Sequence, residues 1–123
     1  MQVLGVDIGG SGIKGALVDL ESGEFASERI RIKTPASFKI DEVTETIATL
    51  VREFDHNGPV GVGFPAAVAD GIVLTAPTAH SVKGWINKSV NERFSDAAGC
   101  DVKVLNDADA AGLAEIRYGA GVT

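Results

Sequence analysis

The sequence predicts an α/β domain in which helices cover a mixed β-sheet. Three strand-like runs separated by turns fill the first 33 residues, and the apolar period becomes helical after Pro35. Strand-like and helical segments alternate from there to the end, which is typical of a sheet with helices on its faces. The 123 residues suffice for one hydrophobic core, so we expect residues 1–123 to form a single domain.

The strands at the start of the chain are predicted from short apolar runs and from alternation. Val3–Val6 has the composition of a buried strand, and Ile13–Asp19 follows it after a glycine-rich turn. Phe25–Lys33 predicts a half-exposed third strand, because Ile30 and Ile32 alternate with charged side chains. The three runs together predict a β-meander with two tight hairpins.

A helical period begins at Ile40, where one apolar stripe recurs every three or four residues. The stripe consists of Val43, Ile47, Leu50, Val51 and Phe54. Asp41 is the expected N-cap, and Asn57–Pro59 is expected to stop the helix. The predicted elements that follow are a strand over Val60–Phe64, a hairpin over Ala66–Thr75 around Asp70 and Gly71, a loop to Trp85, a helix over Asn87–Ala98, a strand over Val102–Leu105 and an alanine-rich helix from Asn106 through Tyr118.

Composition and charge exclude several classes of function. The formal net charge is −6 and the basic residues are scattered, so we expect neither nucleic acid nor an anionic membrane as a partner. The single cysteine, Cys100, forbids an internal disulfide, as is usual in a reducing compartment, and no flanking motif gives it a catalytic role. The sequence starts without the features of a signal peptide and contains no membrane span, so we expect a cytoplasmic protein.

The segment from Asp7 to Lys14 has the composition of a phosphate-binding turn. Backbone N–H groups of such a turn can converge on phosphate oxygens, and its members are Gly9, Gly10, Ser11 and Gly12. Asp7 is a candidate for holding Mg²⁺ through water, and Lys14 for placing a positive charge on a phosphate. The alternative is a simple glycine-rich hairpin. The Walker and dinucleotide-binding motifs do not fit, because both need a helix where a strand follows here.

A second polar pair, Asn106 and Asp107, stands where a predicted strand passes into a predicted helix. Asp107 is either an N-cap or a carboxylate that projects into a cleft at the carboxyl end of the strand. In the second case it can accept the proton of a substrate hydroxyl during phosphoryl transfer. Asn106 offers both a donor and an acceptor, which suits a polyol.

Taken together, three segments resemble the ROK family of sugar kinases in order and spacing. Val6–Gly15 resembles the first phosphate motif of that family, and Gly61–Ala66 resembles the strand and turn that line its sugar pocket. Val104–Gly112 resembles the catalytic segment. The stretch from Val104 to Gly121 is especially similar to the polyphosphate/ATP glucokinases. The resemblance covers nearly the whole chain.

The resemblance implies an actin-like, ribonuclease-H-like fold with two domains and a cleft between them. It implies that Asp107 is the general base for the 6-hydroxyl of a hexose, and that Asn106 binds the sugar. It places Pro65 and Ala66 at the sugar. It also implies Mg²⁺ and a phosphoryl donor, ATP or polyphosphate, at Asp7, Gly9, Gly10, Ser11, Gly12 and Lys14.

The sequence departs from the family pattern at two places in the sugar pocket. Ala66 stands where the family usually has glycine after the proline, and the loop before Trp85 lacks the asparagine that glucokinases usually carry. The nearest candidates for that role are Thr78 and His80, although a histidine in such a position is more commonly an exposed loop residue than a sugar ligand. We therefore expect glucose or a related hexose without choosing between them.

The 123 residues cover only the N-terminal half of the family pattern. The second phosphate motif, the adenosine pocket and the zinc site of many members belong to the half that is missing here. We therefore expect the chain alone to be inactive, and expect a possible homodimer. Two alternatives to a kinase are a sugar-sensing regulator of the same family, which would need a DNA-binding segment before the first strand, and an ATPase-type interaction module. The presence of both Asp107 and the full glycine turn favours the enzyme.

Overall fold

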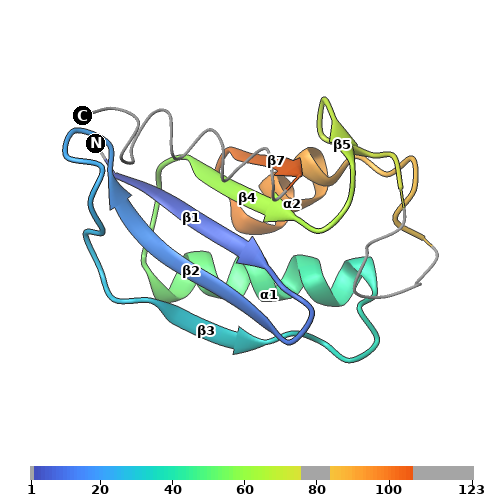
Figure 1. Cartoon of the computed structure of the whole chain (residues 1–123), viewed down its shortest axis with the longest axis horizontal. Helices are drawn as coiled ribbons and strands as arrows, with labels where there is room; N and C mark the ends of the chain where they lie inside the picture. Colours follow the sequence, from blue (N-terminus) through green and yellow to red (C-terminus); the bar gives the residue numbers. More distant parts are fainter. Residues whose placement is uncertain (1, 76–83, 107–123) are drawn as a thin grey trace.

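A five-stranded mixed sheet with two helices on one face makes up most of the computed structural model, which describes residues 2–75 and 84–106 (Figure 1). The strand order is β3-β2-β1-β4-β7, and a two-stranded hairpin, β5-β6, stands beside the sheet. The elements in chain order are β1 (Gln2–Ile8), β2 (Gly12–Asp19), β3 (Ile30–Lys33), α1 (Ile40–Glu53), β4 (Val60–Phe64), β5 (Val68–Ala69), β6 (Ile72–Val73), α2 (Val90–Ala98) and β7 (Val102–Asn106).

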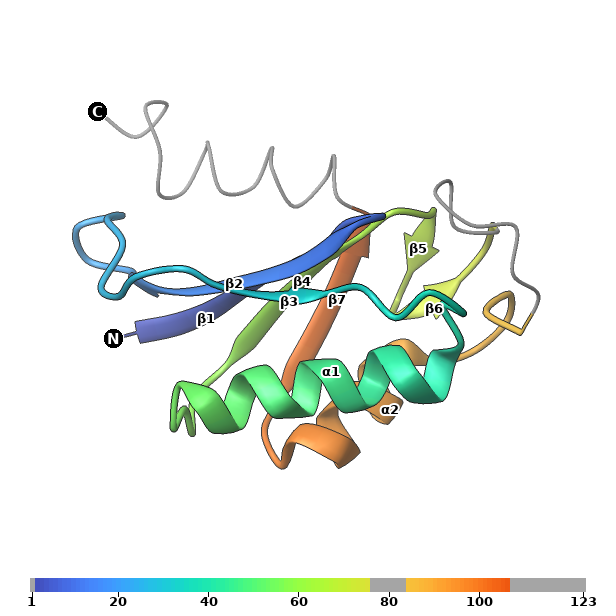
Figure 2. The same ribbon diagram turned by 90° about the horizontal axis from the view of Figure 1, so that it is seen from below.

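Strand pairing combines an antiparallel meander with a parallel centre. β1 pairs antiparallel with β2, and β2 pairs antiparallel with β3. β1 pairs parallel with β4, and β4 pairs parallel with β7. Because β1, β4 and β7 run in the same direction, their carboxyl ends meet at one edge of the sheet (Figure 2).

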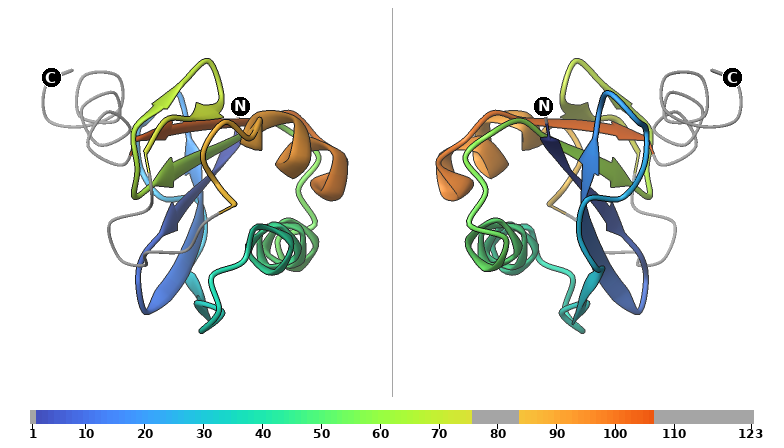
Figure 3. Two further views of the ribbon diagram at one scale, coloured as in Figure 1. Left: turned by 90° about the vertical axis from the view of Figure 1, so that its right-hand side faces the viewer. Right: turned by 90° about the vertical axis from the view of Figure 1, so that its left-hand side faces the viewer.

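Both helices cover the same face of the sheet and lie side by side (Figures 2 and 3). In β1, the side chains of Leu4, Val6 and Ile8 are buried, whereas Asp7 on the opposite face is exposed. This alternation follows from the two-residue period of a strand. The apolar stripe predicted for α1 is buried as expected at Val43, Ile47, Leu50 and Val51.

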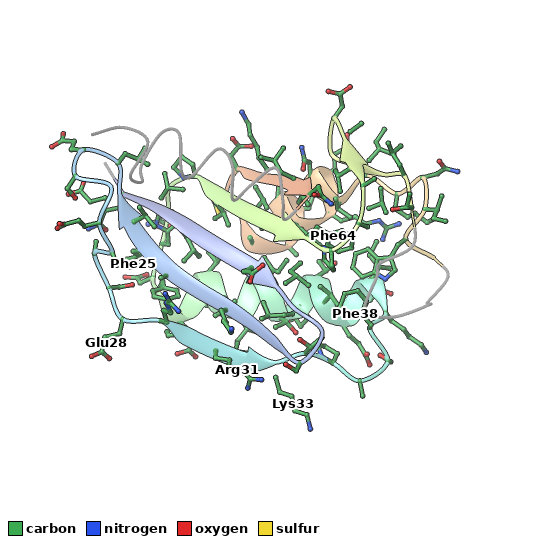
Figure 4. All side chains as sticks on the ribbon, viewed as in Figure 1. Phe25, Glu28, Arg31, Lys33, Phe38 and Phe64 are labelled. Carbon is green, nitrogen blue, oxygen red and sulfur yellow. The ribbon has the colours of Figure 1, made fainter. Side chains whose placement is uncertain are left out.

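Three aromatic side chains form the part of the core that lies under the carboxyl edge of the sheet. Phe38, Phe64 and Trp85 are each 0% exposed. The rings of Phe64 and Trp85 have centroids 4.8 Å apart, and those of Phe38 and Trp85 are 5.4 Å apart. Phe38 and Phe64 lie at the same end of the molecule (Figure 4). The Nε1–H of Trp85 donates a hydrogen bond of 2.9 Å to the carbonyl of Phe38. Trp85 is therefore a packing residue of the core.

The third strand is shorter than predicted. It spans Ile30–Lys33 rather than Phe25–Lys33, and Phe25 makes only an isolated bridge to Val18. The hydroxyl of Ser27 accepts the N–H of Leu17 at 2.9 Å, in the place where a backbone carbonyl would continue the ladder. A serine side chain that competes for a backbone donor in this way interrupts strand pairing.

The starts of both helices also differ from the prediction. Lys39, not Asp41, occupies the N-cap position of α1, and Asp41 is an acidic residue of the first turn, where the helix dipole favours it. α2 starts at Val90 rather than Asn87, because the backbone of the preceding residues pairs with β6. Asn87 donates its N–H to the carbonyl of Val73 at 2.8 Å.

The predicted hairpin around Asp70 and Gly71 is confirmed. Both residues have positive φ, +51° and +76°, as a two-residue type I′ turn requires. The loop expected before Trp85 falls mainly on residues 76–83, and the helix expected from Asn106 through Tyr118 falls almost wholly on residues 107–118. Both ranges lie outside the described residues. Within residues 2–75 and 84–106, no helix is long and apolar enough to cross a membrane.

We predict that Trp85→Phe destabilises the chain by about 1–3 kcal/mol, because it removes the donor to the Phe38 carbonyl and leaves space in a packed core. Urea denaturation followed by circular dichroism measures the change. Phe25→Leu is the control, because Phe25 is 61% exposed, and its effect should stay within about 0.5 kcal/mol. Equal effects of the two substitutions would contradict the packing role of Trp85.

Candidate functional site: a glycine turn and two strand ends at one edge of the sheet

The candidate site is built from three chain segments that leave the sheet at the same edge. The glycine turn follows β1, the turn at Pro65 and Ala66 follows β4, and Asn106 ends β7. The register of the parallel strands fixes how the ends of these strands line up. Asp7 of β1 lies beside Gly63 of β4. Phe64, one residue further along β4, pairs with Asn106 on β7. Parallel sheets bind ligands at this edge, because each strand there turns into a loop.

The glycine turn is tight and is closed by a hydrogen bond of its own. Gly9 donates its N–H to the carbonyl of Gly12 at 2.9 Å, and a Cβ atom built on Gly9 would lie 2.9 Å from the same oxygen. Glycine is therefore required at position 9 by close backbone approach. None of residues 9–12 has a positive φ, so the glycines of this turn are not explained by a left-handed backbone.

Two residues that the sequence analysis did not select, Thr34 and Arg31, bind the carbonyl groups of this turn. The hydroxyl of Thr34 donates to the carbonyl of Gly9 at 2.8 Å, and its N–H donates to that of Ser11 at 3.3 Å. Nη2 of Arg31 also donates to the Ser11 carbonyl, at 2.9 Å. Thr34 is 5% exposed, and it is the one buried residue with a polar or charged side chain in the part of the chain that the structure describes. The available sequence signal was a threonine immediately before the proline that ends β3.

Asp7 and Lys14 lie opposite each other on β1 and β2, on the face of the sheet away from the helices. Both side chains are exposed. Among the described residues, no group of three His, Cys, Asp or Glu side chains is arranged to hold a metal. Asp7 therefore offers a single carboxylate, which fits Mg²⁺ only where water and phosphate oxygens complete the shell, as is usual for this ion.

The side chain of Asn106 is fixed by the turn after β4. Its Nδ2 donates to the carbonyl of Ala66 at 2.8 Å, which joins the ends of β4 and β7 through one hydrogen bond. Ala66 is 3% exposed, so its methyl group fills part of the base of this turn. The structure thus brings together the glycine turn, Pro65, Ala66 and Asn106. Asp107, Thr78 and His80, predicted for the same site, lie outside the described residues.

Two other features of the surface do not belong to this site. Cys100 is half-buried, and burial, followed by the charge of Asp101, raises the pKa of its thiol, so the thiol stays protonated near neutral pH. A shallow groove of about 530 Å³ runs between α1 and the segment after β3, and it contains none of the predicted site residues. Its lining residues are Ile32, Pro35, Ala36, Ser37, Glu42, Glu45, Thr46 and Thr49.

Comparison with known proteins connects this arrangement to characterised enzymes. The family model described as the ROK family matches residues 3–123. The polyphosphate glucokinase of Mycobacterium tuberculosis is 47% identical over 118 residues, which are 95% of this chain and 44% of the relative. The chain therefore spans less than half the length of that relative. The N-acetylmannosamine kinase of Salmonella typhi is 29% identical over 94% of this chain and 39% of its own.

Solved structures agree with the sequence relatives. A polyphosphate/ATP-glucomannokinase from an Arthrobacter strain superimposes with a TM-score of 0.89 and 42% identity, over 98% of this chain and 49% of that one. A ROK family glucokinase from Streptomyces griseus, solved with glucose and AMPPNP, gives 0.80 and 32%, over 98% of this chain and 38% of that one. These neighbours share the actin-like, mixed α/β fold that the sequence predicts. The family match over residues 3–123 and these likenesses show that the chain belongs to the ROK family.

Proposed function

We propose that this chain is the N-terminal, sugar- and phosphate-binding half of a sugar kinase. The complete enzyme would transfer the terminal phosphoryl group of polyphosphate or ATP to the 6-hydroxyl of glucose or a related hexose. The observation that carries the proposal is the meeting of the glycine turn, Pro65–Ala66 and Asn106 at one edge of a parallel sheet. The names of the relatives, polyphosphate glucokinase and glucomannokinase, support the choice of donors and of sugar.

Each part of the edge has a role in this proposal. Asn106, directed by its bond to the Ala66 carbonyl, hydrogen-bonds the sugar, and Asp107, the next residue along the chain, accepts the proton of the attacking hydroxyl. The N–H groups of residues 10–12 receive the donor phosphates, Gly9 closes the turn with its own N–H, and Lys14 adds a positive charge. Asp7 would hold Mg²⁺ through water, and the ion would supply positive charge against the charge that develops on the transferred group. Thr78 and His80 are further candidates for contact with the sugar.

The proposal extends to the location, the partners and the oligomeric state of the complete enzyme. The enzyme acts in the cytoplasm on a free hexose, binds neither nucleic acid nor membrane, and forms a homodimer in its complete length. Residues 1–123 form one domain of it. A sugar-sensing regulator of the ROK family is the alternative, and measurable phosphoryl transfer by the complete protein would exclude it.

We predict that Asp107→Asn in the complete protein lowers the turnover number by about 100- to 10,000-fold, because the amide cannot accept the proton of the hydroxyl. The measurement is a coupled assay for hexose 6-phosphate, run with glucose and mannose against ATP and polyphosphate. Asp109→Asn is the matched control, since it makes the same change two residues further on, and it should retain most of the activity. An Asp107→Asn enzyme that kept its turnover while folded would remove the general base from the proposal.

We also predict that residues 1–123 alone give no measurable phosphorylation of a hexose with either donor. Phosphoryl transfer needs the donor held on both sides of the cleft with water excluded, and this chain supplies one side. The same coupled assay, at high protein concentration, checks this expectation. Robust turnover by the chain that disappears in its Asp107→Asn variant would contradict it, and that variant separates true activity from a contaminating kinase.

A further inference from the structure

We propose that Thr34, assisted by Arg31, is a positioning residue for the donor phosphates, because it sets the direction of the N–H groups in the glycine turn. The inference rests on the proposed role of that turn in phosphate binding. It goes further, because it assigns the geometry of the turn to Thr34. This residue directly follows β3 and lies 25 positions after Gly9 in the chain. Thr34 itself touches no substrate in this proposal.

The argument starts from the planarity of the peptide group. In a trans peptide the C=O and the following N–H point in opposite directions. The Gly9 carbonyl is bound by the Thr34 hydroxyl at 2.8 Å, so the N–H of Gly10 is directed away from Thr34. The Ser11 carbonyl is bound by the Thr34 N–H and by Arg31, so the N–H of Gly12 is likewise directed away from β3.

This direction of the N–H groups suits phosphate binding at the proposed site. In the sheet order β3-β2-β1-β4-β7, the strands that end at Pro65 and Asn106 lie on the far side of β1 from β3. Groups turned away from Thr34 therefore face the side on which the sugar site stands. A nest of N–H groups binds an anion well only when its orientation is already set before the anion arrives.

The burial of Thr34 agrees with this role. A threonine hydroxyl that is 5% exposed needs a partner, and here its partner is a carbonyl of the glycine turn rather than one of its own strand. Glycine-rich turns have many accessible conformations, so a turn with three glycines needs an outside contact to hold one of them. Arg31 adds a second contact at the Ser11 carbonyl, but it also brings a positive charge that attracts phosphate by itself.

The test uses Thr34→Val, which removes the hydroxyl at nearly constant volume and leaves the charge unchanged. Thr34→Ser restores the hydroxyl, and Thr44→Val is the matched control. Thr44 is a half-buried threonine whose hydroxyl also donates to a backbone carbonyl, that of Ile40 at 2.6 Å, but within α1. If Thr34→Val does not fold, Thr34→Ala takes its place, because a smaller side chain cannot clash.

Two measurements are made on the complete protein and its variants, in which both sides of the cleft are present. The first is ¹⁵N relaxation of the amides of residues 10–12 without ligand, and the second is the dissociation constant for inorganic tripolyphosphate with Mg²⁺, from amide shift changes. We expect Thr34→Val to make these amides more mobile and to weaken binding by about tenfold, through loss of a preset geometry. Thr34→Ser and Thr44→Val should match the unsubstituted protein in both measurements.

The outcomes separate this inference from the proposed function. If the unsubstituted protein binds tripolyphosphate but Thr34→Val binds it equally well, the positioning role is wrong and the phosphate turn stands. If weakening occurs equally in Thr34→Val and Thr44→Val, the effect is one of general stability and the inference is again overturned. If the unsubstituted protein shows no shift at residues 9–12 with tripolyphosphate, the phosphate role of the turn fails, and this inference fails with it.

Discussion

The parallel register of β1, β4 and β7 is the constraint on which the candidate site depends. Backbone hydrogen bonds set Asp7 level with Gly63, and Phe64 level with Asn106, so the carboxyl ends of the three strands lie at the same level. A slip of one residue in either pairing would turn each strand over and expose its buried face. Leu4 and Val62 are buried in the observed register, and a slip would expose them to water. The hydrophobic core that stabilises the fold therefore also aligns the site.

The aromatic cluster of Phe38, Phe64 and Trp85 lies in the core beneath the chain segments that form the candidate site. Phe64 immediately precedes the Pro65 turn, and Phe38 follows the Thr34 segment that holds the glycine turn. Phe38 adopts φ of +50°, which costs a bulky residue about 1–3 kcal/mol. The ring contacts and the hydrogen bond from Trp85 offset that cost. These contacts keep Phe38 in its strained conformation, in the segment that follows Thr34.

Local signals in the sequence predicted those parts of the fold that depend on local chemistry. The Asp70–Gly71 hairpin and the glycine turn were predicted because positive φ and close approach demand particular residues. The apolar stripe of α1 was predicted because a helical period needs no information from distant segments. The family and its fold came from three motifs in order, and the comparisons confirm both.

What depends on distant contacts was not predicted. The early end of the β2–β3 ladder results from the bond between Ser27 and Leu17, ten residues apart in the chain. The roles of Thr34 and Arg31 depend on β3 ending beside the glycine turn, a contact that no spacing in the sequence reveals. The predicted roles of Asp107, Thr78 and His80 stay predictions, since these residues lie outside the described part of the chain.

The placement of the Arg31 guanidinium over Gly12 couples these two positions through one contact. A Cβ atom at position 12 would meet that guanidinium group, which already occupies the space. The guanidinium is the end of a flexible, exposed side chain, so it can swing aside, but it then loses its hydrogen bond to the Ser11 carbonyl. A residue larger than glycine at position 12 would therefore act less through steric clash than by detaching the turn from one of its two anchors at the end of β3.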